Sequence, residues 1–482
     1  MKNILFAASE GVPFIKTGGL ADVVGSLPKC LDKENYDVRV ILPKYVCMKP
    51  AMKDIMEKVT HFYMDFNWKS VCVGVLKAEV EGITYYFIDN EEYFNGPKPY
   101  SDNGLFEIEK YAYFSKAVLS VLPLIEFQPD VLHCHDWQTG LIPVFLKDSF
   151  CKNPFYENIK TMFTIHNLKF QGKWSPAAVQ RITGLDWSYF NSYEKLEAYG
   201  DANLLKGGLV YADTISTVSD TYAEEIQTAF FGEGLDGLLR YRSKDLVGIV
   251  NGIVYDDFNP ETDKHIEAPY SVADFKEKKV LNKLALQKEL GLRQSADKMM
   301  IGIVSRLTDQ KGLDLIECVL DELCQDDIQL VILGTGEERY ENCFRHFDWK
   351  YADKVSANIY YSDPLSHKIY ASCDAFLMPS LFETCGLSHL MSLHYGTLPI
   401  VRETGGLKDT VDPYNEYEGT GTGFSFTNYN AHDMLNTIRY AEHVYYDTRE
   451  DWDKIAQRAM SADFSWNTSA IKYQEIYDKL IG

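Results

Sequence analysis

Residues 16–29, Lys-Thr-Gly-Gly-Leu-Ala-Asp-Val-Val-Gly-Ser-Leu-Pro-Lys, lie between a predicted strand and a predicted helix. The apolar run at 3–8 predicts a buried first strand, and the apolar residues of 20–31 follow helical spacing. Gly18 and Gly19 therefore lie where a strand leads into a helix, and the two glycines leave the backbone free to adopt positive φ and let a ligand approach closely. The unpaired N–H groups of the helix start, together with Lys16, favour phosphate. An ordinary strand–helix turn with a surface lysine is the alternative.

Composition limits the possible classes of protein. The chain has 482 residues, 46% of them apolar, which predicts two or three folded domains. Its formal net charge of −22 argues against non-specific binding to nucleic acid or to an anionic membrane. The ten cysteines form no Cys-x-x-Cys pair, which indicates reduced thiols and predicts a cytoplasmic protein. The sequence predicts neither a signal peptide nor a membrane span.

Strand, loop and helix patterns alternate along both halves of the chain. In the first half, strands are predicted near 38–42, 131–135, 160–165, 214–218 and 247–250, with further strands at 60–67, 71–80 and 84–89 and a surface loop at 91–105. Residues from about 255 to 298 are charged and contain proline, which favours a domain boundary. The pattern then restarts with strands at 300–304, 329–333, 375–378 and 398–401 and ends with an amphipathic helix at 466–480. This order predicts parallel sheets covered on both faces.

The glycine motif of the first half is repeated in similar form in the second half. Thr17-Gly18-Gly19-Leu20-Ala21-Asp22-Val23-Val24 reappears as Thr404-Gly405-Gly406-Leu407-Lys408-Asp409-Thr410-Val411, again after an apolar strand. Chance use of a favoured turn is the alternative. The repeat favours two doubly wound domains that each offer an anion-binding loop to a ligand held between them.

Two loops of the second half carry candidate chemistry. Arg306 and Lys311 follow a strand, and two cations near a helix start can neutralise a departing pyrophosphate; a solvated basic loop is the alternative. Glu383 can accept hydrogen bonds from sugar hydroxyls, and the amides of Gly386 and Leu387 can meet a phosphate. For Glu383, a helix-capping acid is the alternative.

Histidines at two strand ends suggest other chemistries. His166 can act through its ring or its carbonyl, although a buried, hydrogen-bonded histidine is the commoner case. His133 and His135 share one face of a predicted strand but lack a nearby third ligand, so we do not expect a structural zinc site. The sequence also lacks a Ser-His-Asp order, a Gly-x-Ser-x-Gly elbow and a singled-out carboxylate pair.

These motifs together resemble those of bacterial glycogen synthases and plant starch synthases. The resemblance covers nearly the whole chain and is specific because of the number, order and spacing of its parts. They are residues 16–22, 133–137, 164–167, 205–209, 211–213, 231–235, 251–253, 305–312, 379–387, 395–397, 404–411 and 463–466.

The resemblance implies a fold and an activity. The fold is the GT-B architecture, an α/β arrangement of two Rossmann-like domains facing each other across a deep cleft. An acceptor-side domain spans 1–253 and is completed by the helix 464–482, and a nucleotide-sugar-binding domain spans 254–463. The implied reaction transfers glucose from ADP-glucose to the non-reducing end of an α-1,4-glucan, such as glycogen, starch or a malto-oligosaccharide, with retention of configuration.

The resemblance also implies roles for individual residues. Arg306 and Lys311 would stabilise the departing ADP, Glu383 would bind glucose hydroxyls, and the carbonyl of His166 would stabilise positive charge at the anomeric carbon. The implied nucleotide-sugar-binding residues are Lys16, Gly18, Gly19, Asn251, Arg306, Lys311, Tyr361 (near the adenine), Gly386, Leu387, Thr404, Gly405 and Gly406. Asp22, Asp136 and Asn167 would lie toward the acceptor or the glucose.

No cofactor or metal is expected, because fixed cations and amides can stabilise the leaving group directly. The expected partners are ADP-glucose and the glucan, and neither nucleic acid nor a membrane is expected. A phosphorylase is disfavoured because no pyridoxal-lysine motif is present.

The chain departs from the family pattern at five positions. Val254 stands where Asp is usual, His389 where Gln is usual, Phe258 where Trp is common and Asp220 where Pro is common, and Met391 leaves the two-glutamate pattern of related retaining transferases incomplete. These differences leave two other functions open. One is a glucosyltransferase that uses UDP-glucose, and the other is a catalytically silent glucan-binding protein.

Overall fold

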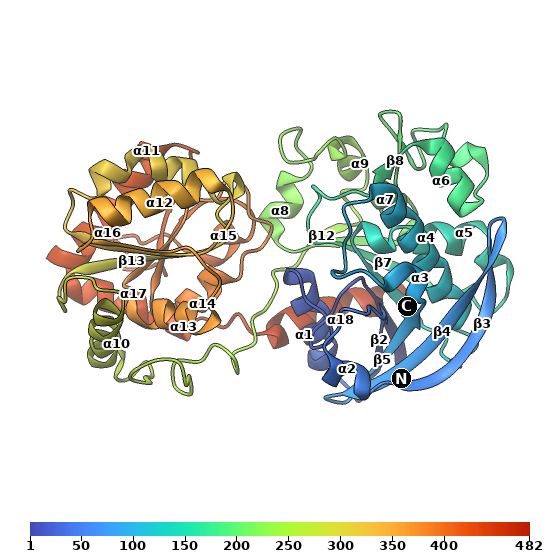
Figure 1. The fold of residues 1–482 in the computed structure, drawn as a ribbon, viewed down its shortest axis with the longest axis horizontal. Helices are drawn as coiled ribbons and strands as arrows, with labels where there is room; N and C mark the ends of the chain where they lie inside the picture. The colour runs from blue at the N-terminus through green and yellow to red at the C-terminus, as the bar shows by residue number, and fades with distance from the viewer. The chain divides into compact units, whose positions relative to one another are not determined.

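The computed structural model describes residues 1–482, which divide into two compact units. The first unit comprises Met1–Val218, Ala223–Gly252 and Trp466–Gly482. The second comprises Ile253–Ser465 together with the short segment Ser219–Tyr222. Figure 1 colours the chain from its N-terminus to its C-terminus.

The first unit is built on a nine-stranded sheet in the order β12-β11-β7-β6-β1-β2-β5-β4-β3. Its strands are β1 (Lys2–Ala7), β2 (Tyr36–Pro43), β3 (Glu57–Phe66), β4 (Lys69–Val80), β5 (Ile83–Asp89), β6 (Val131–His135), β7 (Lys160–Ile165), β11 (Thr214–Thr217) and β12 (Leu246–Gly248). A separate three-stranded sheet contains β8 (Lys173–Trp174), β9 (Glu197–Ala198) and β10 (Asp201–Asn203). The helices are α1 (Gly19–Cys30), α2 (Pro50–Asp54), α3 (Glu91–Phe94), α4 (Gly104–Val121), α5 (Leu141–Asp148), α6 (Pro176–Thr183), α7 (Leu204–Tyr211), α9 (Asp236–Tyr241) and α18 (Trp466–Ile481), and α8 (Asp220–Glu225) starts in the segment that groups with the second unit.

The large sheet confirms the predicted parallel arrangement only in part. Neighbouring strands from β12 to β5 are parallel, but β4 pairs antiparallel with both β5 and β3. The three strands follow one another through short turns, and a hairpin connection forces the antiparallel direction. The expected loop at 91–105 was also partly wrong, because α3 lies in it and α4 starts at Gly104, where Asn103 caps the helix by accepting a hydrogen bond from Phe106 N.

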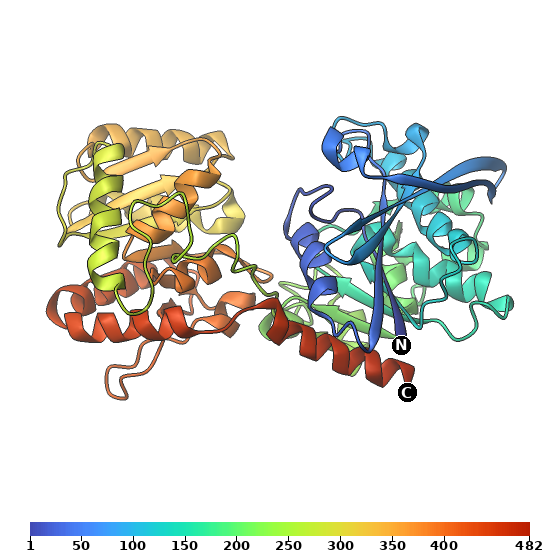
Figure 2. The ribbon, with the colours of Figure 1, turned by 90° about the horizontal axis from the view of Figure 1, so that it is seen from below.

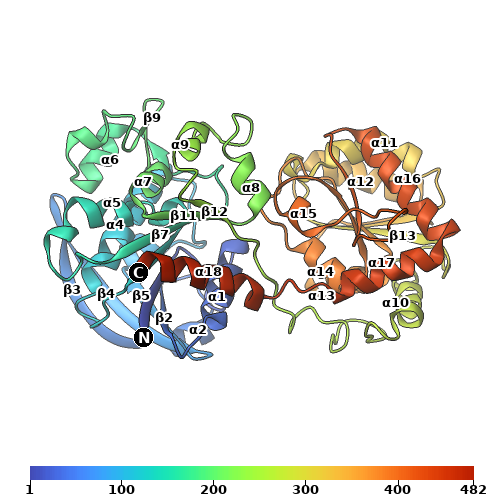
Figure 3. The same cartoon turned by 180° about the vertical axis from the view of Figure 1, so that it is seen from behind.

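The last helix returns to the first unit. Figures 2 and 3 show α18 lying beside α1. Its inward face carries Tyr473 and Tyr477, both fully buried, and the Tyr477 hydroxyl lies 2.8 Å from His133 Nδ1 on β6. The amphipathic pattern predicted for 466–480 therefore reflects a helix that closes the core of the N-terminal sheet.

The second unit contains a six-stranded, wholly parallel sheet in the order β15-β14-β13-β16-β17-β18. Figure 1 shows α11 and α12 over one face of this sheet and α13 and α14 over the other. The strands are β13 (Met299–Val304), β14 (Ile328–Leu333), β15 (Val355–Asn358), β16 (Ala375–Met378), β17 (Leu398–Arg402) and β18 (Phe424–Phe426). The helices are α10 (Phe275–Glu289), α11 (Leu313–Leu323), α12 (Glu338–Lys350), α13 (Asp363–Ser372), α14 (Ser388–His394), α15 (Gly405–Thr410), α16 (Ala431–Asp447) and α17 (Arg449–Ser461).

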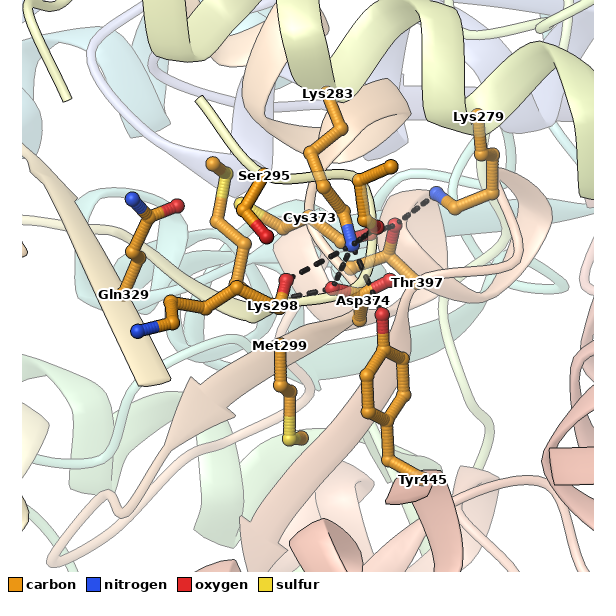
Figure 4. Close-up of polar contacts among 12 residues, drawn as sticks. Lys279, Lys283, Ser295, Lys298, Met299, Gln329, Cys373, Asp374, Thr397 and Tyr445 are labelled. Atoms are coloured by element: carbon orange, nitrogen blue, oxygen red, sulfur yellow. Dashed lines mark hydrogen bonds and ion pairs between the residues drawn. The ribbon is translucent and has the colours of Figure 1, made fainter. Parts of the chain in front are cut away.

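Helix α10 was missed by the sequence analysis, which treated 255–298 as a boundary. Four of its six buried residues are polar or charged, namely Lys279, Asn282, Lys283 and Gln287, so it lacks the continuous apolar stripe by which a helix is normally recognised. Figure 4 shows how that face is satisfied. Lys283 Nζ lies 2.6 Å from Asp374 Oδ2 and 3.0 Å from the Tyr445 hydroxyl, while Lys279 Nζ donates to Thr397 Oγ1 over 2.7 Å.

The loops that carry the candidate site residues follow strands at the switch point of each sheet, where the strand order reverses direction. In the first unit β1 lies between β2 and β6, and in the second β13 lies between β14 and β16. Ligands of doubly wound sheets bind outside the carboxyl ends of the strands at such points. The loops after β1 and β6, and those after β13 and β16, are therefore brought together within their own units.

Candidate active site

The loop after β1 is held by Glu10, a residue that the sequence analysis did not single out. The buried Glu10 carboxylate accepts hydrogen bonds from Thr17 N, from Thr17 Oγ1 at 2.8 Å and from the Tyr100 hydroxyl at 2.9 Å. Burial raises the pKa of Glu10, although these hydrogen bonds oppose the shift. The carboxylate thus fixes the backbone at Thr17, just before the two glycines. In the sequence, the only signal of this role is that Glu10 follows a buried strand.

Gly18 and Gly19 do not adopt positive φ, although glycine leaves the backbone free to do so. Gly18 is the extended N-cap of α1 with φ −156°, and Gly19 begins the helix. A Cβ added at either glycine would meet no atom within 4 Å, so the space beside this backbone is open. Lys16 is exposed and pairs with Asp22 over 2.7 Å, which places both predicted residues beside the loop.

Asp136 connects the ends of β6 and β7. It is a non-glycine residue with φ +55°, and its Oδ1 accepts a hydrogen bond of 2.7 Å from the His166 amide. Burial raises the pKa of Asp136 to about 7, while hydrogen bonds from the amides of His166 and Asn167 oppose the rise. Asp136 therefore orders the peptide at 166–167, where the sequence predicted two site residues.

His166 is a buried, neutral histidine. Its Nε2 lies 2.9 Å from Nδ1 of His135, and burial lowers the pKa of His166 to about 3. Asn167 beside it is half-buried, and its Oδ1 accepts from Lys169 N over 3.0 Å. An uncharged ring would not oppose positive charge that developed nearby; the role predicted for this residue stays a prediction.

The paired histidines of β6 have protein partners. His133 Nε2 lies 2.6 Å from Thr164 Oγ1, and its Nδ1 is bonded to Tyr477. Both ring nitrogens of His133 therefore have protein partners. Asn251, which follows β12, is buried and its Oδ1 has no partner, so this predicted binding residue keeps a free acceptor.

In the second unit an ion pair joins the loop after β13 to the loop after β16. Lys311 Nζ lies 2.5 Å from Glu383 Oε2, and the two side chains are only 13% and 8% exposed. Ser380 Oγ adds a bond of 3.2 Å to the same oxygen. The sequence predicted Lys311 and Glu383 separately, and neither their contact nor the part played by Ser380 was foreseen.

Arg306 lies in the same loop as Lys311 and is exposed. It forms no ion pair, unlike Lys311. Tyr361, expected near an adenine, is 88% exposed in the loop before α13. Both side chains are therefore accessible to a ligand of this unit.

The glycine motif of the second half lies against the Glu383 loop. Gly405 has φ +45°, and a Cβ there would lie 1.7 Å from the carbonyl oxygen of Glu383. A Cβ at Gly406 would lie 2.2 Å from the Cys385 carbonyl oxygen. The buried Thr404 is the N-cap of α15. This motif therefore packs two backbones together, whereas its counterpart at Gly18 and Gly19 leaves space.

Gly386 and Leu387 precede α14 beside His389, one of the departures from the family pattern. Gly386 has φ +77°, and a Cβ there would lie 2.9 Å from His389 Nδ1. His389 Nε2 lies 2.6 Å from Thr410 Oγ1, and burial, helped by Lys311, lowers the pKa of His389 to about 3. The histidine thus fills the space next to the predicted phosphate-binding amides without adding a charge.

Comparison with known proteins identifies the family. Residues 3–241 match the model of the starch synthase catalytic domain, and residues 286–459 match glycosyl transferases group 1. The glycogen synthase of Lachnospira eligens is 64% identical over 481 residues and covers 100% of both chains. This chain belongs to the glycogen synthase family. The glycogen synthase of Desulforamulus reducens is 50% identical over 479 residues, 99% of each chain.

Solved structures agree with this assignment to the glycogen and starch synthases. The catalytic domain of starch synthase IV from Arabidopsis thaliana, bound to ADP and acarbose, is 32% identical with a TM-score of 0.89 and covers 100% of this chain and 99% of its own. Sucrose-phosphate synthase from Thermosynechococcus elongatus, at 16% identity and a TM-score of 0.61, shares the fold. The predictions of GT-B architecture and of a glycosyltransferase of the glycogen and starch synthase type are confirmed. In the chain described here, no helix has the length and apolarity that a bilayer crossing requires.

Proposed function

We propose that this glycogen synthase family member transfers glucose from ADP-glucose to the non-reducing end of an α-1,4-glucan with retention of configuration and without a metal. The observation that carries the proposal is the loop after β13, where the exposed Arg306 stands near the buried Lys311–Glu383 pair. Cations fixed at the carboxyl end of a parallel strand suit a diphosphate leaving group. The related catalytic domain of starch synthase IV is bound to ADP and acarbose, which supports the same donor and a glucan-like acceptor.

The chemistry required of the residues follows from the bond that breaks. The electron pair of the glucose C1–O bond leaves with ADP, so positive charge develops on the sugar and negative charge on the diphosphate. Arg306 and Lys311 would stabilise the negative charge, and the amides of Gly386 and Leu387 would add dipoles. Glu383, held by Lys311 and Ser380, would accept hydrogen bonds from glucose hydroxyls.

The first unit would supply the groups around the sugar carbon. The acceptor 4-hydroxyl would attack C1 on the face from which ADP departs, and its proton would pass to the departing phosphate. His166, neutral and held by Asp136 and His135, would place its carbonyl beside C1. No side chain is required as a covalent nucleophile in this scheme.

A transfer assay tests the proposal. ADP-glucose and UDP-glucose, each labelled in the glucose, are incubated in parallel with the enzyme and a malto-oligosaccharide, with EDTA present in a matched set. We expect elongated α-linked product from ADP-glucose, at a rate that EDTA does not change. Faster transfer from UDP-glucose would overturn the donor assignment, and binding of the oligosaccharide without transfer from either donor would indicate a silent glucan-binding protein.

A further inference from the structure

A cluster of two histidines and one aspartate lies at the start of α13 in the second unit. His265, Asp363 and His367 each offer one ligand atom, and these three atoms lie within 4.8 Å of one another. Asp363 and His367 are separated by one helical turn and share a face of α13, whereas His265 comes from the segment before α10. We propose that these three side chains bind a divalent transition-metal ion of the Zn²⁺ type.

The orientation of His367 supports the proposal. The ring is buried and stacks on Phe258 with a centroid distance of 4.3 Å and an interplanar angle of 12°. Its Nδ1 lies 2.8 Å from Oδ2 of Asp263, so this nitrogen carries the proton and donates it to the carboxylate. Nε2 is left with its lone pair, and it faces Asp363 Oδ2 at 3.8 Å. A divalent cation placed between these two electron-rich atoms would interact favourably with both.

Asp263 has the position of an outer-shell carboxylate. Its Oδ2 also accepts a hydrogen bond of 2.5 Å from the Tyr395 hydroxyl, and its Oδ1 accepts one of 2.8 Å from the His265 amide. The same side chain therefore fixes the ring of His367 and the backbone of His265. A metal-bound histidine commonly donates its second ring N–H to such a carboxylate, which sets the tautomer and strengthens the ligand.

The spacing of the donors suits a small tetrahedral ion. Ligand bonds of about 2.0–2.2 Å place neighbouring ligand atoms about 3.3 Å apart. The present separations of up to 4.8 Å would close through side-chain rotation of His265 and Asp363, which are both exposed, onto the fixed His367. Imidazole nitrogens favour zinc, nickel or copper over magnesium and calcium, which prefer all-oxygen sites. Three protein ligands leave a fourth position for water.

A bound ion would join two parts of the second unit that are distant in sequence. One is the segment before α10 that contains Phe258 and His265, and the other is the first turn of α13. Tyr361 lies just before that turn. Because the ion binds the folded arrangement and not the unfolded chain, it would raise the unfolding temperature of the protein.

Calorimetric titration of tag-free, EDTA-treated and dialysed full-length protein with ZnCl2 tests the site. We expect one saturable site that is lost or weakened at least about tenfold in His265→Ala and in Asp363→Asn. Both side chains are exposed, so these substitutions leave the core of the unit unchanged. His443→Ala is the matched control, because His443 and Asp447 form an exposed i,i+4 pair without a third ligand. Asp263→Asn should weaken binding about 10–100-fold through the orientation of His367.

A second measurement separates this site from thiol binding. Co²⁺ in place of Zn²⁺ should give visible absorption without the intense thiolate-to-metal bands that cysteine ligands produce. The absence of saturable Zn²⁺ binding would overturn the proposal. Unchanged binding in both His265→Ala and Asp363→Asn would also overturn it. The transfer assay is independent of this result, since the proposed reaction uses no metal.

Discussion

Lys311 Nζ lies 2.5 Å from Oε2 of Glu383, and this ion pair joins the loops after two neighbouring parallel strands of the second sheet. Both side chains are nearly buried, and Ser380 is the only other side chain that bonds the Glu383 carboxylate. The lysine thus holds the acid in place while keeping its own charge at the strand ends. Lys311 would then serve both the proposed leaving-group role and the positioning of Glu383, the acid proposed to bind sugar hydroxyls.

Lys311→Ala is expected to lower kcat by about 100-fold or more, because a cation that acts on developing charge contributes chiefly in the transition state. Steady-state kinetics with varied donor would separate kcat from KM. A change confined to KM would contradict the assignment. Lys454→Ala, which removes an exposed lysine paired with Asp451 over 3.0 Å, is the control and should leave kcat unchanged.

Two glycine motifs that look alike in sequence are expected to respond differently to alanine. Gly405→Ala should destabilise the protein by roughly 3 kcal/mol or more, because the new Cβ would overlap a backbone oxygen at positive φ. Gly18→Ala and Gly19→Ala should change stability by only about 1 kcal/mol, since nothing lies within 4 Å. If a ligand occupies that open space, these two variants should raise the donor KM about tenfold or more. Urea unfolding measures the change in stability, and steady-state kinetics with varied donor measures the change in KM. An unchanged KM in both Gly18→Ala and Gly19→Ala would contradict the assignment of this loop to donor binding.

The pH dependence of the reaction is expected to follow Asp136. Burial raises the pKa of Asp136 to about 7, so a requirement for its carboxylate would make kcat/KM fall as the pH drops below about 7. His166, with its pKa lowered to about 3, would not titrate in that range. Asp136→Asn should lack this acid limb in a profile from pH 5.5 to 9. An identical limb in the variant would assign the titration to another group.

The same shift affects stability with a definite sign. Between its ordinary pKa of 3.8 and about 7, Asp136 binds a proton in the folded chain that it has lost in the unfolded chain. Its contribution to the free energy of unfolding is therefore full below that window and declines as the pH rises through it. Unfolding measured on the wild type and on Asp136→Asn across the window checks this, and it also shows whether a loss of activity reflects unfolding.

The buried pair of Lys283 and Asp374 is expected to be costly to break. Lys283→Met should lower the free energy of unfolding by about 3–5 kcal/mol, because the carboxylate of Asp374 would stay buried with the Met300 amide at 2.7 Å as its remaining partner. The double variant Lys283→Met, Asp374→Asn should recover part of that loss. Lys276→Ala on the same helix, whose 53% exposed side chain pairs with Asp453, is the control and should cost about 1 kcal/mol or less. An equal loss in the free energy of unfolding for Lys283→Met and Lys276→Ala would contradict this prediction.

Much of the architecture could be predicted from local patterns. Apolar runs followed by helical spacing predicted the strands at the centre of both sheets, because these strands are buried on both faces and carry few polar residues. The same patterns failed for α10, whose buried positions include Lys279 and Lys283. Periodicity detects an apolar face, but it does not detect a polar face whose partners come from elsewhere in the fold.

The sequence by itself determined the strand–loop–helix order, the nature of the loops at the strand ends and, through its motifs, the family. Only the tertiary structure decided which of those residues touch. The partners Lys311 and Glu383 are 72 positions apart, and Asp136 reaches the amide of His166 across 30 positions. Such contacts depend on which strands become neighbours, and a pattern of local spacing carries no information about that order. For the same reason, the cluster of His265, Asp363 and His367 could not be found from the sequence, since its members meet only when the segment before α10 folds back onto α13.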